Sequence, residues 1–209
     1  MYTLYYGRGA ASLAIHAALH EIGVPYQLAE IDLDAGQQRS PDYLRLNPQG
    51  KIPTLLIEGQ PFTESAALML ILAERHPQSQ LAPAAGTLAR AAWYQLALSL
   101  ANDLGNNFRL WFYPSDIGSS EGDAATRGAI RQRIEAAWER LDARLAANGP
   151  YLLGEAFSGV DLMLTMYMRW SRNMPRPATD WPALRKYADM MRARPSWQHV
   201  SHVEALSDW

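Results

Sequence analysis

The sequence predicts an α/β domain built on a mixed four-stranded sheet, followed by an all-helical domain. Strand and helix patterns alternate as far as Pro77, whereas every apolar pattern after Gly86 has helical spacing. The 209 residues are 48% hydrophobic and 19% charged, which suffices for a packed core and argues against disorder. We therefore expect a first domain over residues 1–77, a linker over 78–86 and a helical domain over 87–209.

The first domain begins with a strand–helix–strand unit. Tyr2 to Tyr6 is aromatic and β-prone, which favours a strand. Helical apolar spacing over residues 11–22 predicts a helix, and Gly23 ends it. The alternation from Tyr26 to Leu33 predicts a second strand. A right-handed crossover through the helix makes the two strands parallel.

A short helix, a hairpin and a longer helix complete the first domain. Ser40 suits the N-cap of the short helix and Pro41 suits its first helical position. Glu58 and Gly59 suit the turn of an antiparallel hairpin, so the sheet is mixed. The hairpin strands are expected over residues 52–57 and 60–62, and the longer helix over 64–76.

The second domain consists of amphipathic helices. Ser158 and Asp161 match a capping box in which Asp replaces Glu, so the Asp161 side chain is expected to cap its own helix. Phe157 suits the staple position before that cap. The helices are expected over residues 87–112, 123–147, 158–173, 181–194 and 196–206.

Composition excludes several classes of function. A net charge of −2 gives no reason to expect a nucleic acid or an anionic membrane as a partner. No apolar run reaches the roughly 18–20 residues that span a bilayer, and no secretory signal is visible, so a cytoplasmic location is expected. With zero cysteines, disulfides and thiolate metal sites are impossible. The five histidines lack ligand spacing and Gly7–Gly9 lacks that of a phosphate loop, so neither metal nor nucleotide is predicted.

Two short motifs point to a small peptide-like ligand. Pro53 suits the first residue of a strand and is a candidate cis proline, and Ile52 before it is biased to extended geometry. Ile52 can therefore offer its backbone to an extended ligand. Glu64 and Ser65 open a helix, where a carboxylate suits an amine and the free N–H groups suit a carboxylate. The alternatives are an ordinary strand-start proline and a plain helix cap.

These motifs, with the capping box after Phe157, resemble the cytosolic glutathione transferase family over essentially the whole chain. The first domain would then be thioredoxin-like, and the stretch from Leu4 to Ala14 looks most like the bacterial beta-type branch. The resemblance implies glutathione as co-substrate and a homodimer. It implies that Ile52 pairs with the cysteinyl part of glutathione, that Pro53 is cis, and that the γ-glutamyl end is bound by Glu64 and Ser65. Further glutathione contacts are expected from Gln37, Lys51 and, toward a neighbouring subunit's ligand, Asp103.

Glutathione chemistry requires the thiolate form of the cysteinyl sulfur. A free thiol has a pKa of about 8.5. A hydroxyl near the start of the first helix would lower that pKa, so Ser12 is the first candidate and Tyr6 the second. Ser12 could also be a plain N-cap. Ala11 stands where many beta-type members carry a cysteine, and Gly105 and Asn106 stand where they often carry a His-Lys pair. Cysteine-based chemistry is therefore excluded.

The expected activity is conjugation of glutathione to a small hydrophobic electrophile, a detoxification reaction. The pocket for that acceptor is expected among side chains of the helical domain, although an aromatic stripe at helical spacing also suits a core; the candidates are Arg109, Phe112, Tyr113, Met166 and Trp170. Three alternatives are a glutathione-dependent disulfide or peroxide reductase, a glutathione-dependent isomerase, and a protein that binds glutathione without catalysis.

Overall fold

The computed structural model describes residues 1–120 and 123–209. Packing divides the chain into two compact units. The first contains Met1–Ala82 and Ala193–Asp208, and the second contains Pro83–Arg192 together with Trp209. Helix α9 (Pro195–Val203) therefore packs with the first unit, although it follows the helical unit along the chain.

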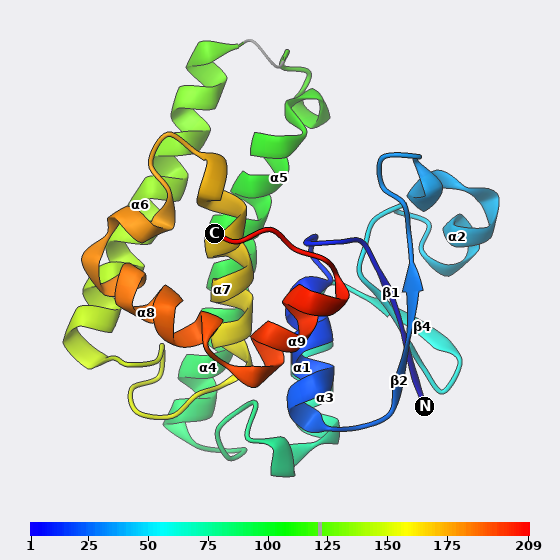
Figure 1. The fold of residues 1–209 in the computed structure, drawn as a ribbon, viewed down its shortest axis with the longest axis horizontal. Coiled ribbons are helices and arrows are strands. Elements are labelled where there is room, and N and C mark those ends of the chain that lie inside the picture. The colour runs from blue at the N-terminus through cyan, green and yellow to red at the C-terminus, as the bar shows by residue number, and fades with distance from the viewer. Residues whose placement is uncertain (121–122) are drawn as a thin grey trace. The chain divides into compact units, whose positions relative to one another are not determined.

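The first unit is built on the mixed four-stranded sheet that the sequence predicts (Figure 1). Strand β1 lies parallel to β2 and antiparallel to β3, which in turn pairs antiparallel with β4. Both turn residues between β3 and β4, Glu58 (φ 53°) and Gly59 (φ 84°), have the positive φ that a two-residue hairpin turn requires. The strands are β1 (Tyr2–Tyr6), β2 (Tyr26–Glu30), β3 (Thr54–Ile57) and β4 (Gln60–Thr63), in the order β2-β1-β3-β4.

Strand register brings three separate segments to one end of this sheet. Tyr5 is paired with Thr54, and Thr54 is paired with Thr63. The end of β1, the start of β3 and the end of β4 therefore lie next to one another. Because β2 runs parallel to β1, Glu30 joins them as the partner of Tyr6.

Helices cover both faces of the sheet. Figure 1 shows α1 (Leu13–Ile22), α3 (Ser65–Arg75) and α9 on one side and α2 (Pro41–Leu46) on the other. The side chains of Leu4, Leu13 and Leu68 are fully buried between the sheet and the first group. On the other face Tyr43 packs edge-on against Tyr5, with ring centroids 5.8 Å apart. Ser40 caps α2 as expected, accepting a hydrogen bond from the Tyr43 amide.

Several predicted elements are longer than the observed ones, and two of them lie in the first strand–helix–strand unit. The strand expected to reach Leu33 ends at Glu30, because Asp32 closes a turn by accepting a hydrogen bond from the Ala35 amide. The helix expected from Ala11 begins at Leu13.

A polar network ties α3 to the start of β1. The Tyr2 hydroxyl lies 2.7 Å from His76 Nε2 and accepts a hydrogen bond from Arg75 Nε at 3.2 Å. When His76 is neutral with its hydrogen on Nδ1, Tyr2 can donate its own hydrogen to Nε2 while it accepts from Arg75. Burial, followed by the Arg75 charge, lowers the pKa of His76 below its ordinary value.

We expect the first unit to lose stability as the pH falls below about 6.5, the ordinary pKa of histidine. The lowered pKa means that the unfolded chain takes up the His76 proton before the folded chain does, so acid favours unfolding. In His76→Gln an uncharged acceptor replaces the ring, so the loss between pH 7.5 and 5 should be smaller. Thermal melts of both proteins across this range measure the difference. Equal losses in the two proteins would contradict the assignment.

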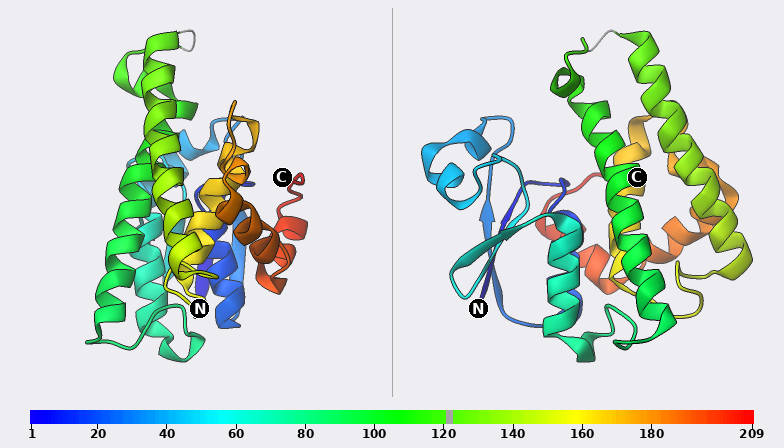
Figure 2. Two further views of the ribbon diagram at one scale, coloured as in Figure 1. Left: turned by 90° about the vertical axis from the view of Figure 1, so that its left-hand side faces the viewer. Right: turned by 180° about the vertical axis from the view of Figure 1, so that it is seen from behind.

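The second unit is all-helical, as the sequence predicts. Figure 2 shows α4 continuing into α5 beside α6. The two join through a π-helical segment over Leu100–Gly105, so the predicted long helix changes its winding midway. A Cβ built at Gly105 would lie 2.9 Å from the Tyr167 hydroxyl, so glycine allows this close approach. The helices are α4 (Leu88–Ser99), α5 (Asn106–Phe112), α6 (Ala124–Asn148), α7 (Gly159–Trp170) and α8 (Pro182–Arg192).

Asp161 caps α7, as the capping box predicts. Its Oδ2 accepts hydrogen bonds from the amide and hydroxyl of Ser158, and its Oδ1 accepts from the amide of Leu152 and the hydroxyl of Tyr187. The side chain is fully buried, and burial raises the pKa of Asp161 to about 6 despite these four donors. Asp161 thus joins the loop before α7 to α8.

Candidate functional site

The loop between β1 and α1 is closed by Ser12. Its hydroxyl donates to the Gly7 carbonyl at 3.2 Å and accepts from the Gly7 amide at 3.3 Å, and the side chain is fully buried. Ser12 holds the N-cap position of α1, yet among the described residues its side chain makes no capping hydrogen bond. The hydroxyl therefore shapes the loop from within.

Ser65 connects the start of α3 to this same loop. Its hydroxyl donates to the Ala11 carbonyl at 2.9 Å. The contact joins two segments that sequence analysis selected independently, the loop before the first helix and the Glu64–Ser65 helix start.

The side chain of Ile52 also lies against the loop between β1 and α1. The bond between Ile52 and Pro53 is cis, which confirms that part of the prediction. A Cβ built at Gly7 would be 2.7 Å from Ile52 Cδ1 and 2.9 Å from Leu33 Cδ1, so glycine at position 7 makes room for both side chains. The segment before Ile52 is held through the Lys51 carbonyl, which accepts from the Tyr43 hydroxyl at 2.7 Å.

Gly7→Ala should lower the free energy of unfolding by about 1–2 kcal/mol, because the new methyl group must displace two side-chain tips. The matched control is Gly128→Ala in α6, where nothing among the described residues lies within 4 Å of the added Cβ. That change should raise the free energy of unfolding by about 0.5–1 kcal/mol. Urea unfolding measures both, and a stabilising effect of Gly7→Ala would show that Ile52 does not pack there.

Glu64 is exposed and its backbone is unusual. It stands before α3 with φ 69° and ψ 108°, a conformation that few residues other than glycine adopt. Among the described residues its carboxylate has no hydrogen-bond or ion-pair partner, so it is available to a ligand amine. Gln37 lies in the turn after β2, where its Oε1 accepts from the Asp32 amide at 2.9 Å, and the Lys51 side chain is exposed.

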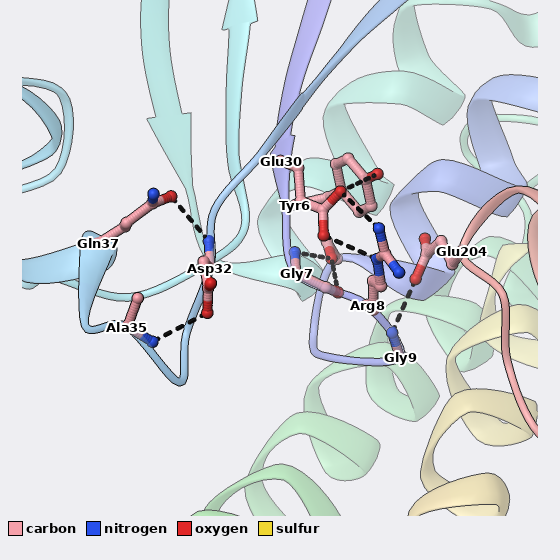
Figure 3. A network of polar contacts seen from close by, with 10 residues as sticks. Tyr6, Gly7, Arg8, Gly9, Glu30, Asp32, Ala35, Gln37 and Glu204 are labelled. Atoms are coloured by element: carbon pink, nitrogen blue, oxygen red, sulfur yellow. Dashed lines mark hydrogen bonds and ion pairs between the residues drawn. The ribbon is translucent and has the colours of Figure 1, made fainter.

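The Tyr6 hydroxyl is engaged by an ion pair that sequence analysis missed (Figure 3). It donates to Glu30 Oε2 at 3.3 Å, while Arg8 donates to both oxygens of Glu30 at 2.7 and 3.2 Å. Burial raises the pKa of Tyr6 and the Glu30 charge adds to the effect, so the phenol keeps its proton. The signal that could have revealed this group is the pairing of Tyr6 with Glu30 at the ends of parallel strands.

The remaining candidates lie in the helical unit. Asp103 accepts a hydrogen bond from Arg140 at 3.0 Å, and Arg109 pairs with Asp116 while stacking 3.9 Å above the Tyr113 ring. Five of the aromatic side chains form a cluster, and the side chains of Phe112 (46%) and Tyr113 (45%) are about half exposed. Met166 is fully buried in α7. The cluster contains Phe108, Phe112, Trp138, Tyr167 and Trp170.

Both units match known family models. The model of the glutathione S-transferase N-terminal domain matches residues 1–74, and that of the C-terminal domain matches residues 91–189. The chain belongs to the glutathione S-transferase family. The predicted family and fold class are thereby confirmed.

Two curated relatives of this transferase-family chain carry different activity names. It is 28% identical to glutathione S-transferase GST-4.5 of Xanthomonas campestris over 98% of this chain and 99% of the relative. It is 32% identical to the maleylacetoacetate isomerase of Rhizobium meliloti over 76% of each protein.

Solved structures of other transferases share the whole fold. A glutathione transferase homologue from Sulfitobacter with bound glutathione superimposes with a TM-score of 0.90 at 27% identity, covering 99% of both chains. The beta-class enzyme of Sphingomonas chungbukensis superimposes with a TM-score of 0.86 at 30% identity, covering 98% of this chain and 100% of that one. The similarity to the bacterial beta-type branch is thus confirmed.

Within residues 1–120 and 123–209, no cluster of three or more His, Asp or Glu side chains is arranged to hold a metal ion. In the same residues, no helix is long and apolar enough to cross a membrane.

Proposed function

We propose that this transferase-family protein binds glutathione at the end of the sheet where β1, β3 and β4 meet. The observation that supports this most is the convergence of three segments, namely Ile52 with its cis proline, the loop closed by Ser12, and the helix start at Glu64 and Ser65. Ile52 would pair its backbone with the cysteinyl part of the tripeptide, and Glu64 would bind the γ-glutamyl amine. Gln37 and Lys51 would contact the remainder of the ligand.

The thiolate would be stabilised by the loop before α1. Ser12 donates to Gly7 and Tyr6 donates to Glu30, so either hydroxyl must turn from its present acceptor to reach sulfur. Ser12 would give up a hydrogen bond to a neutral carbonyl, whereas Tyr6 would give up one to a charged carboxylate. Because hydrogen bonds to charged groups are stronger, the smaller loss favours Ser12. Main-chain N–H groups at the start of α1 add to the stabilisation.

The reaction we propose is transfer of glutathione to a small hydrophobic electrophile. Side chains of the helical unit that are at least partly exposed would bind that acceptor; Arg109, Phe112, Tyr113 and Trp170 are the proposed residues, and buried Met166 would contribute only after its neighbours moved. We also propose a cytoplasmic homodimer in which Asp103 reaches the ligand amine of a neighbouring copy, after leaving Arg140.

A second candidate is glutathione-dependent isomerisation. It is favoured by the isomerase name of the Rhizobium meliloti relative. The start of this chain lacks the Ser-Ser-Cys pattern of such isomerases, which weighs against the isomerase.

Ser12→Ala should raise the thiol pKa of bound glutathione by roughly one unit, because a single hydrogen bond to the thiolate is lost. Calorimetry with glutathione first establishes binding, and thiolate absorbance as a function of pH then gives the pKa. An unchanged pKa would remove Ser12 from this role and promote Tyr6, for which Tyr6→Phe is the corresponding test.

The chemistry is tested with a panel of aryl halides, organic peroxides, glutathione disulfide and a cis-trans isomerisation substrate. Turnover of peroxide or disulfide alone would replace transfer with reduction, and binding without any turnover would leave a glutathione-binding protein. Absence of glutathione binding at millimolar concentration would overturn the proposed function altogether.

A further inference from the structure

A carboxylate from the far end of the chain reaches the loop of the proposed thiol site. Glu204 follows α9, and its side chain is fully buried. Its Oε2 accepts a hydrogen bond from the Gly9 amide at 2.8 Å, as Figure 3 shows, and its Oε1 lies 2.7 Å from His16 Nδ1 in α1. One carboxylate thus joins α9, α1 and the loop between β1 and α1, all within the first unit.

The cost of burying this group indicates a specific role. A buried carboxylate is strongly destabilising unless each oxygen has a donor, and even a satisfied buried pair adds little stability compared with apolar packing. Here each oxygen has one donor, provided that the His16 hydrogen is on Nδ1. Among the described residues His16 Nε2 has no hydrogen-bond partner. The buried ring therefore satisfies Glu204 through Nδ1 while its other nitrogen stays unsatisfied.

Besides the ion pair of Arg8 with Glu30, three hydrogen-bonded contacts hold the loop. Ser12 binds Gly7 from within, and Ser65 of α3 binds the Ala11 carbonyl. Glu204 binds the Gly9 amide, at a residue with φ 65° that marks the bend of the loop. Of these three contacts, only the third comes from a residue without a proposed contact to glutathione.

We propose that Glu204 is a positioning residue for the glutathione thiol. By holding the Gly9 amide it fixes the bend that precedes Ala11 and Ser12, and so fixes the direction of the N–H groups and the hydroxyl that stabilise the thiolate. This inference rests on the proposed glutathione site.

The test compares Glu204→Gln with a matched control, Glu21→Gln. Glu21 also joins α1 to α9, since its Oε1 accepts from Arg194 at 2.9 Å and from the Ser196 hydroxyl, but neither contact involves the loop. Two quantities are measured in each protein. One is the hydrogen exchange rate of the Gly9 amide, and the other is the thiol pKa of bound glutathione.

In Glu204→Gln we expect the Gly9 amide to exchange at least about tenfold faster, because the charge-assisted acceptor is weakened. We also expect the thiol pKa to rise by about half a unit or more while the Kd for glutathione changes by less than about threefold. Removal of a negative charge alone would lower the thiol pKa, so the sign separates positioning from a direct charge effect. Glu21→Gln should change neither quantity.

A thiol pKa that falls or stays constant in Glu204→Gln would overturn the proposal, as would an equal rise in Glu21→Gln. If Glu204→Gln does not fold, the hydrogen exchange rate of the Gly9 amide in the unsubstituted protein tests the proposal instead. Exchange at the rate of an unprotected amide would show that Glu204 does not hold the Gly9 amide, and would overturn the proposal. Failure of the unsubstituted protein to bind glutathione would instead reject the proposed function, while the exchange rates would still report on the anchor.

Discussion

Glu64→Ala should weaken glutathione binding by about 10–100-fold, the effect of losing one charge-assisted hydrogen bond of about 1.5–3 kcal/mol. The carboxylate is exposed beside the start of α3, where Ser65 already holds the loop. Glutamate already adopts φ 69° there, so alanine, which also has a Cβ, leaves the backbone strain at this position unchanged. Glu64→Gln keeps an acceptor of the same length and should show a smaller loss, which isolates the charge.

Calorimetry with reduced glutathione measures this loss, and Glu58→Ala is the control. Glu58 is a second exposed acid with positive φ in the same unit, but it lies in the β3–β4 turn at the opposite end of the sheet and pairs with Arg75. Its replacement should leave the Kd unchanged. Equal effects at both positions would mean that Glu64 acts through folding and does not touch the ligand.

Asp161→Ala should lower the free energy of unfolding by about 3–5 kcal/mol, the range expected when one partner is removed from a buried charged network. The change leaves the amides of Leu152 and Ser158 without their acceptor, and the Tyr187 hydroxyl keeps only the main-chain carbonyl of residue 161. Asp180→Ala is the control, because that residue forms an exposed ion pair with Arg185 and should cost less than about 1 kcal/mol. Similar losses in the two variants would contradict the network.

The pH dependence gives an independent test of Asp161. Its pKa of about 6 in the folded chain exceeds the value of about 3.9 expected when unfolded. The folded state therefore binds the proton more tightly, so the contribution of Asp161 to stability is full below about pH 4 and is lost as the pH rises through 6. Asp161→Asn should remove this dependence, which urea unfolding at pH 4.5 and 7.5 can measure as a difference from the unsubstituted protein.

Local chemistry made most of the fold predictable. Pro53, Ser40 and the hairpin turn each carry a backbone preference that acts over a few residues, and their elements are found as expected. The same holds for Asp161, whose capping role follows from its spacing to Ser158.

Contacts between distant residues could not be predicted in the same way. Arg8 and Glu30 meet because of strand register, and His16 and Glu204 meet because α9 packs on α1. Neither pair has a sequence spacing that marks it. The predicted helical domain included α9 for the same reason, since adjacency along the chain carries no information about the face that a helix covers.

The first unit contains residues that precede the helical unit along the chain and residues that follow it, and this has a consequence for biosynthesis. During translation, all of Pro83–Arg192 emerges before the segment Ala193–Asp208 that covers α1. Until that segment leaves the ribosome, apolar side chains of α1 lack their cover and are open to chaperones. The sheet unit, although made first, is therefore the last to be completed.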